Sequence, residues 1–239
     1  MKNIYILTLI LFIISCGEKV REEITERYDD GKKKTIMKFV GEGSEEVMVE
    51  KLVYSESGDT LLWENYDSKG ELDGKWTEYY PNGQIEGNYK DGEKDGKWTL
   101  YLKNGRIFRE ENYKDGKLDG KWTEYYENGQ IEENYKDGEK DGKRTSYYEN
   151  GQIRSESNYK DGELDGKWSE YYENGQIRGE ENYKDGKREG KFNWYHQNGK
   201  IWSKGNYKDG KQIGKWTDYN EDGSIKKVEE YNDGKLIEK

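Results

Sequence analysis

A pattern of about 24 residues recurs from Gly74 almost to the end of this 239-residue chain, and it constrains the fold more than any other feature. Each copy begins with a Gly-Lys pair, reaches an Asn-Gly or Asp-Gly turn nine residues later, and closes with a Tyr six or eight residues after the turn. The copies are 22 or 24 residues long. Because strand side chains alternate between two faces, a difference of two residues keeps each side chain on its face. The pattern therefore predicts an all-β fold, an elongated single-layer antiparallel β-meander or open solenoid of hairpin repeats.

The composition is unusual for a folded protein. Only 30% of the residues are hydrophobic and 38% are charged, a balance that borders on that of disordered chains. The 22 Tyr and 8 Trp nevertheless fall at fixed positions of the copies. A lone hairpin is marginal in water, whereas stacked copies share their aromatic side chains. We therefore expect an ordered array in which each copy packs against the next.

The one proline of the chain indicates a turn type for the hairpins. Pro81 fits position i+1 of a type I turn, with Gly83 in the left-handed conformation as a G1 bulge. In a two-residue loop Pro81 would flank the turn, and its missing N–H would remove a closing hydrogen bond. The predicted register places these pairs opposite each other: Tyr79 and Ile85, Thr77 and Gly87, and Lys75 and Tyr89.

This register assigns the aromatic side chains to two faces. The first is a structural core stripe, whose residue types do not vary between copies: Tyr79, Ile85, Tyr89, Tyr125, Ile131, Tyr135, Tyr171, Ile177 and Tyr183. The second is a candidate binding face that varies between copies: Trp76, Tyr80, Trp98, Trp122, Tyr126, Trp168, Tyr172 and Trp216. Large aromatic side chains mostly serve burial, so the favoured alternative is that these Trp residues pack against neighbouring strands of the same sheet.

The N-terminal residues have the features of an export signal. Lys2 precedes an apolar run, residues 4–14, that is too short for a stable membrane span. Residues 13–16 resemble a bacterial lipobox, in which Cys16 is lipidated and becomes the mature N-terminus; the alternative is an ordinary signal peptide with an incidental Cys. We predict four segments: a signal peptide over 1–15, a polar tether over 16–26, a degenerate N-terminal cap over 27–73, and seven regular repeats over 74–239.

Charge and residue counts argue against several classes of function. The net charge of −10 argues against a nucleic-acid partner, because that binding needs Lys and Arg to neutralise phosphates. One His and one Cys leave few ways to build a His/Cys metal site, and His196 has no triad partner. Asp-Gly-x-x-Asp-Gly loops such as 91–96 and 161–166 could hold Ca²⁺, although Asp-Gly is also ordinary turn chemistry. We predict no metal, no cofactor and no catalytic residue.

Two stretches carry a family resemblance. Residues 113–122 and 125–129, with their equivalents from Gly70 to Gly234, resemble MORN repeats, specifically the bacterial variant class. The resemblance implies an elongated single-layer antiparallel sheet built from successive hairpins. Sequences of this class often carry the label of a toxin–antitoxin antitoxin component, and some carry a phosphatidylinositol-phosphate kinase label. The kinase label does not suit this chain, which has no Gly-rich phosphate loop. Arg144, Phe192 and Ile213 depart from the pattern.

The expected function is binding without catalysis. We expect a protein of the bacterial cell envelope, attached to a membrane by a lipid anchor at Cys16, whose repeats bind another protein. Two alternatives remain open. One is an antitoxin or immunity role against a toxin at the envelope. The other is binding of a glycan or a lipid head group by the Trp side chains, which stack on sugar rings and attract cations.

Overall fold

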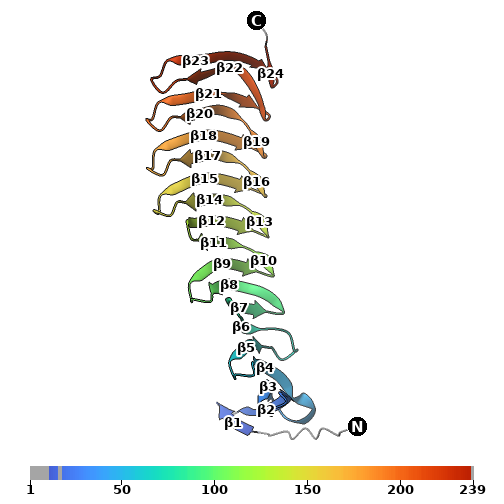
Figure 1. The fold of residues 1–239 in the computed structure, drawn as a ribbon. Coiled ribbons are helices and arrows are strands. Elements are labelled where there is room, and N and C mark those ends of the chain that lie inside the picture. Colours follow the sequence, from blue (N-terminus) through green and yellow to red (C-terminus); the bar gives the residue numbers. More distant parts are fainter. Residues whose placement is uncertain (1–10, 16–17, 238–239) are drawn as a thin grey trace. The chain divides into compact units, whose positions relative to one another are not determined.

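The computed structural model describes residues 11–15 and 18–237 (Figure 1). The chain divides into two compact units, one through Lys117 and one from Leu118. Both units consist of antiparallel β-strands joined by short connections, so the predicted all-β fold of hairpin repeats is confirmed. Within the described residues, no helix has the length and apolar content needed to cross a membrane.

In the N-terminal unit each strand pairs with the next one along the chain. A single 3₁₀ turn interrupts the described strands of this unit. The elements are β1 (Leu11–Ser15), β2 (Glu18–Arg27), β3 (Lys33–Val40), η1 (Gly43–Glu45), β4 (Val47–Tyr54), β5 (Thr60–Asn65), β6 (Gly74–Tyr80), β7 (Gly83–Lys90), β8 (Glu93–Leu102) and β9 (Ile107–Lys114). The short strand β10 (Lys117–Leu118) spans the division between the units.

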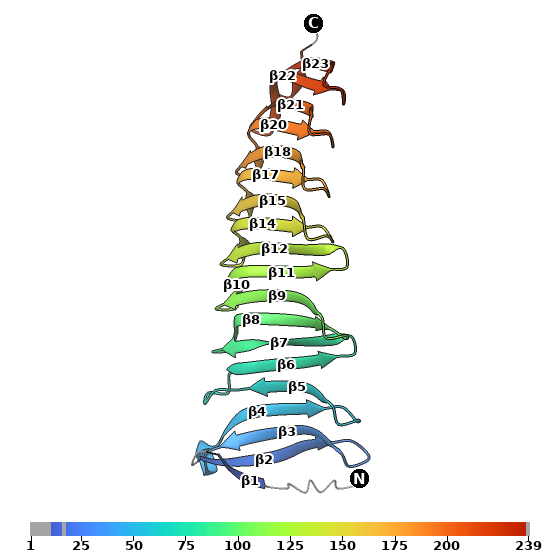
Figure 2. The same cartoon turned by 90° about the vertical axis from the view of Figure 1, so that its left-hand side faces the viewer.

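In the C-terminal unit long strands pair consecutively, and two-residue strands form a second, shorter hairpin in most repeats. The connections in this unit alternate between the two ends of the strands (Figure 2). The strands are β11 (Gly120–Tyr126), β12 (Gly129–Lys136), β13 (Glu139–Lys140), β14 (Gly142–Tyr147), β15 (Ile153–Lys160), β16 (Glu163–Leu164), β17 (Gly166–Tyr171), β18 (Ile177–Lys184), β19 (Lys187–Arg188), β20 (Gly190–Tyr195), β21 (Ile201–Lys208), β22 (Lys211–Tyr219), β23 (Ile225–Asn232) and β24 (Lys235–Leu236).

The hairpin turn differs between the 22- and 24-residue repeats. In the repeat that contains Pro81, the loop has two residues and Tyr80 pairs with Gly83, so the predicted G1 bulge at Gly83 is wrong. In the next repeat the loop has three residues, and Gly105 takes a φ of 79° as the predicted bulge requires. A second bulge at Phe108 adds one more residue. The 24-residue repeats are therefore two residues longer than the 22-residue repeats because they have one more loop residue and one bulge residue.

In the repeat that contains Pro81 the predicted register is wrong by one residue. The observed pairs are Gly74 with Tyr89, Lys75 with Asn88, Trp76 with Gly87, Thr77 with Glu86, Glu78 with Ile85, and Tyr79 with Gln84. Paired residues point to the same face of a sheet, and strand residues two apart share a face. Tyr79 therefore lies on the face opposite to Tyr89, and the single stripe of Tyr and Ile does not exist.

We call the face that carries Trp76, Tyr89 and their equivalents the tryptophan face, and the opposite face, with Thr77, Tyr79 and their equivalents, the threonine face. The members of the predicted stripe divide between the two. The tryptophan face has Ile85, Tyr89, Ile131, Tyr135 and Tyr183. The threonine face has Tyr79, Tyr125, Tyr171 and Ile177.

Both faces contribute to the core. On the tryptophan face Trp98 is 1% exposed, and its ring centroid lies 5.3 Å from that of Trp76 and 5.2 Å from that of Tyr89. On the threonine face Thr77 is 2% exposed, whereas Tyr79 is 40% exposed. Thr77, a position that the sequence analysis did not single out, is therefore more deeply buried than Tyr79 of the predicted stripe.

Polar bonds join successive hairpins on the threonine face. Lys143 Nζ lies 2.5 Å from Glu156, and the Tyr171 hydroxyl lies 3.2 Å from the same carboxylate. These side chains come from β14, β15 and β17, so one carboxylate bridges two repeats. Lys121, Glu132 and Tyr147 repeat the arrangement.

The Asp-Gly turns form the second hairpin of each repeat. Asp137 has a φ of 52° and Gly138 a φ of 92°, as the two central residues of a type I′ turn require. Asp119, which lies next to the preceding Asp-Gly turn, accepts the Asp137 N–H with its carboxylate at 3.4 Å. The paired Asp residues of the Asp-Gly-x-x-Asp-Gly loops thus have a structural use in successive turns.

The stretch predicted as a tether, 16–26, forms strand β2 from Glu18 onward and pairs with β3. Ile24 and Ile36 lie opposite each other and are buried, which gives this polar stretch an apolar contact that fixes it in the sheet. Cys16 and the first ten residues of the predicted signal peptide lie outside the described residues. The segment predicted as a degenerate cap continues the hairpin pattern: the Tyr28 hydroxyl donates to the Tyr54 carbonyl at 2.7 Å.

Candidate functional site

One repeat of the C-terminal unit, residues 140–161, carries small side chains on the tryptophan face. Arg144 stands where the next repeat has Trp168, and Ser146 stands where it has Glu170. On the partner strand, Ser155 and Ser157 correspond to Gly179 and Glu181. Loss of an indole and two carboxylates from one repeat leaves space above β14 and β15.

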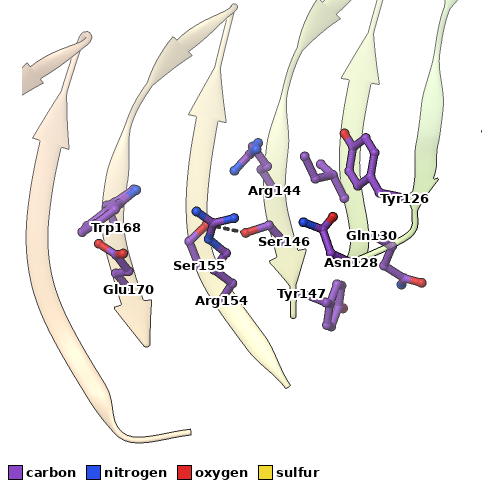
Figure 3. Close-up of a pocket in the computed structure, with 11 residues that line it drawn as sticks. Tyr126, Asn128, Gln130, Arg144, Ser146, Tyr147, Arg154, Ser155, Trp168 and Glu170 are labelled. Carbon is purple, nitrogen blue, oxygen red and sulfur yellow. Dashed lines mark hydrogen bonds between the residues drawn. The ribbon is translucent and has the colours of Figure 1, made fainter. Parts of the chain in front are cut away.

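This space is a hollow of about 400 Å³. Figure 3 shows Trp168 at one side, Tyr126 at the other, and Arg144, Ser146, Ser155 and Arg154 between them. Its walls are lined by Tyr126, Asn128, Gln130, Ile131, Arg144, Ser146, Tyr147, Arg154, Ser155, Trp168 and Glu170. The hydroxyls of Ser146 and Ser155 lie 2.6 Å apart and share a hydrogen bond at its floor.

Arg144 is held by a buried carboxylate. Arg144 Nε donates to Glu133 Oε1 at 2.9 Å, and Lys140 Nζ lies 2.8 Å from the same oxygen. Burial of Glu133 opposes its ionisation, but Lys140, the Tyr135 hydroxyl and Arg144 outweigh that effect and lower its pKa. The cation that replaces Trp at position 144 thus has a carboxylate partner within the chain, which it shares with Lys140.

Arg154 is in a different situation. It is the extra residue of a β-bulge, because Ser146 pairs with Ser155 while Tyr147 pairs with Ile153. The bulge residue of the next repeat, Arg178, donates to Glu170 at 2.8 Å. Among the described residues Arg154 has no carboxylate partner, since Ser146 occupies the place equivalent to Glu170.

The predicted binding residues do not form one continuous exposed surface. Tyr126 and Trp168 line the hollow. Trp98 and Trp216, at 1% and 7% exposure, are packed inside their sheets, as the favoured alternative expected. The other predicted residues lie as follows: Trp76 and Trp122 are half-buried, Tyr80 is exposed, and Tyr172 is half-buried with its hydroxyl 2.7 Å from the Tyr195 carbonyl.

The lone His of the chain has a structural contact. The Nε2 atom of His196 lies 3.0 Å from the Tyr219 carbonyl. In two earlier repeats the hydroxyls of Tyr148 and Tyr172 make the same bond to the following repeat. His196 therefore replaces a Tyr that connects neighbouring hairpins.

Carboxylates gather at one place in the N-terminal unit. Single oxygens of Asp67, Glu71 and Asp91 lie within 4.8 Å of one another. The Asp67 Oδ1 atom accepts the backbone N–H groups of Lys69 and Glu71 at 2.8 and 2.9 Å, and these bonds, that from Glu71 first, lower its pKa. Asp67 is thus occupied in closing its own turn.

Sequence reasoning missed Arg154, Ser146 and Ser155. The signal that could have found them is the comparison of repeats after correct alignment of both strands. Residues 140–161 differ from their neighbours at several positions of one face together, whereas only the change from Trp to Arg144 attracts attention when the first strand is read alone.

Comparison with known proteins identifies the repeats. No curated protein matched the chain. A model of the MORN repeat variant family matches more than half of the chain, in seven segments: 72–91, 94–115, 118–137, 140–161, 164–185, 188–209 and 212–233. Together with the hairpin architecture, these matches show that the chain belongs to the MORN repeat variant family.

Proposed function

We propose that this chain is a non-enzymatic scaffold that binds another protein, and that the partner docks on the tryptophan face at the hollow of the C-terminal unit. The observation that carries the proposal is the composition of the hollow. Trp, Tyr and Arg are the residues that dominate binding energy at protein interfaces, and Trp168, Tyr126 and Arg154 gather here around serine hydroxyls.

The frame around the hollow supports a binding role. Aromatic contacts continue beyond it on the same face, where the Trp168 and Trp194 ring centroids lie 6.1 Å apart. A site supported by paired strands holds its side chains in place, which reduces the entropy lost on binding. The acidic charge of the chain favours a protein partner over a nucleic acid.

Attachment to a bacterial envelope through Cys16 belongs to the same proposal, with a protein partner located there. If that partner is a toxin, the proposed scaffold has an antitoxin or immunity role. The test is affinity capture with the wild-type chain and with Trp168→Ala. A partner that is retained in high salt and lost with Trp168→Ala supports the proposal. Equal recovery by both proteins contradicts docking at the hollow.

Glycan binding is a second candidate, carried by Trp202. This side chain is 46% exposed, and its ring centroid lies 6.2 Å from that of Trp194. Exposed indoles stack on sugar rings. A glycan array read with wild type and with Trp202→Ala tests this candidate: a bound glycan that is lost in the variant supports it, and no bound glycan rejects it.

A further inference from the structure

The repeat after the hollow shows how a guanidinium at the bulge position is normally satisfied. Arg178 and Glu170 form an ion pair at 2.8 Å. Arg178 also lies near an aromatic ring, with its Cζ atom 5.7 Å from the centroid of Tyr172. A carboxylate from the first strand thus meets a guanidinium from the bulge of the second.

The repeat that forms the hollow has the guanidinium without the carboxylate. Arg154 Cζ lies 5.9 Å from the Tyr148 ring centroid, which reproduces the contact of Arg178 with Tyr172. Ser146 stands at the place of the glutamate, so a carboxylate side chain is replaced by a short hydroxymethyl group. The space left by that side chain belongs to the hollow that Arg154 lines.

We propose that the hollow accepts the carboxylate of a glutamate or aspartate side chain of the partner protein, which pairs with Arg154 as Glu170 pairs with Arg178. This inference rests on the proposed function and names the chemistry of the docking contact. The partner supplies the group that the repeat at 164–185 supplies for itself.

The charges around the hollow favour a negative group. Arg144 shares Glu133 with Lys140, and Arg178 pairs with Glu170, so Arg154 is the lining cation that contacts no carboxylate among the described residues. A charge-assisted bond from a guanidinium to a carboxylate is stronger than a neutral hydrogen bond.

The floor of the hollow suits the second carboxylate oxygen. Ser146 and Ser155 each have one hydroxyl hydrogen, and the 2.6 Å bond between them uses only one. The other hydrogen is available to donate. Trp168 and Tyr126 flank the site and can cover the methylene groups of an entering side chain.

The experiment uses a display library of random peptides whose C-terminal ends are fused to the display protein, selected with the full chain. Selected peptides are synthesised with capped termini, and each Glu or Asp is changed in turn to Gln or Asn. Affinities are measured by fluorescence anisotropy for wild type and for Arg154→Gln, Ser146→Glu and Lys226→Gln. Lys226 is the bulge residue of a different repeat and serves as the matched control.

We expect one acidic residue of the peptide to be required, with binding at least about tenfold weaker for its amide form, as for loss of one charge-assisted hydrogen bond. Arg154→Gln removes this preference for the acid. Ser146→Glu also removes it, because the new carboxylate pairs with Arg154 inside the chain. Lys226→Gln keeps the preference. Circular dichroism and thermal melting establish that each variant is folded.

Three results overturn the inference. In the first, acid and amide peptides bind wild type equally. In the second, Arg154→Gln or Ser146→Glu keeps the preference for the acid. In the third, an amide peptide with a free C-terminus binds as well as the acid, which assigns the site to a terminal carboxylate. Peptide binding in these cases still supports the proposed scaffold, whereas a selection that yields no peptide counts against both.

Discussion

Glycine and tryptophan act as pairs across neighbouring strands of the tryptophan face. A Cβ atom at Gly87 would lie 2.2 Å from the Trp98 ring, and one at Gly205 would lie 2.2 Å from the Trp216 ring. Trp98 and Trp216 are also the buried tryptophans of the described chain. At these two sites the glycine lets the indole lie directly on the neighbouring backbone, which allows the Trp ring to be buried.

Gly87→Ala tests this pairing. The added methyl group overlaps the Trp98 ring, and we expect the free energy of unfolding to fall by about 1–3 kcal/mol through overpacking. Urea unfolding measures the change. The double variant Gly87→Ala with Trp98→Leu, in which a smaller side chain leaves room for the methyl group, is the control. The pairing is contradicted if Gly87→Ala is as stable as wild type.

Alkaline pH should weaken the fold through its tyrosines. Burial of Tyr113, together with donation of its hydroxyl to Glu111, raises its pKa to about 12, from an ordinary value of about 10. A raised pKa means that the folded state favours the protonated phenol, so its contribution is complete below about pH 10 and is lost as the pH rises to about 12.

The measurement is the free energy of unfolding across this pH range, with tyrosinate absorbance followed in parallel. Tyr113→Phe should lose less stability than wild type between about pH 10 and pH 12, because the variant has no phenol to ionise at this position. Identical pH dependence of the two proteins would show that ionisation of Tyr113 does not contribute to the loss of stability.

At the scale of the hairpin, length and side-chain direction are linked. A three-residue loop and a bulge occur together in the 24-residue repeat that contains Gly105, and neither occurs in the 22-residue repeat that contains Gly83. Both extra residues lie outside the strand pairing, so Leu100 pairs with Arg109 on the tryptophan face as Glu78 pairs with Ile85.

A deletion experiment follows from this link. Removal of both Arg106 and Phe108 converts the 24-residue repeat into the 22-residue form, in which Leu102 pairs with Gly105 and Leu100 still pairs with Arg109. We expect this protein to fold with a stability within about 2 kcal/mol of wild type. Removal of Phe108 alone also leaves Tyr101 paired with Ile107 and Leu100 paired with Arg109, so we expect this variant to be tolerated equally well. Circular dichroism and urea unfolding measure both variants, and loss of the fold in either one would contradict the prediction.

The Asp-Gly turns lead to a prediction about metal. Their geometry is that of type I′ turns, and carboxylates such as those of Asp67 and Asp119 accept backbone N–H groups. We therefore expect EDTA to leave the melting temperature unchanged and added Ca²⁺ to raise it by no more than a nonspecific salt does. A melting temperature that falls in EDTA and recovers with Ca²⁺ would establish a calcium site instead.

The sequence was sufficient to predict the strands because turn residues and aromatic spacing recur in every repeat. It was not sufficient to predict register. Ile85 and Ile107 follow their turns by two residues in both cases, yet Ile85 pairs with Glu78 on the tryptophan face and Ile107 pairs with Tyr101 on the threonine face. The difference comes from the loop, which has two residues before Gly83 and three up to Gly105, and the Asn-Gly pair present in both turns does not reveal it. The hollow could not be predicted either, because it forms where two paired strands, β14 and β15, both lack the large side chains of the next repeat.

At the scale of the whole molecule, the chain combines a repeat array with a predicted export signal. Cys16→Ala is expected to move the protein from the membrane fraction to the soluble fraction of the envelope, because two or more acyl chains supply most of the membrane affinity of a lipoprotein. Fractionation followed by immunoblotting measures this. Membrane retention of Cys16→Ala would exclude lipidation at Cys16 as the anchor.

Within each unit, every strand pairs with strands that are close to it in the chain. Sheets of this kind have a low contact order, so closing each hairpin costs little loop entropy. Folding can therefore start at any hairpin of a unit and spread to the adjacent ones. Gene duplication of a repeat would lengthen such an array without creating a slower folding step.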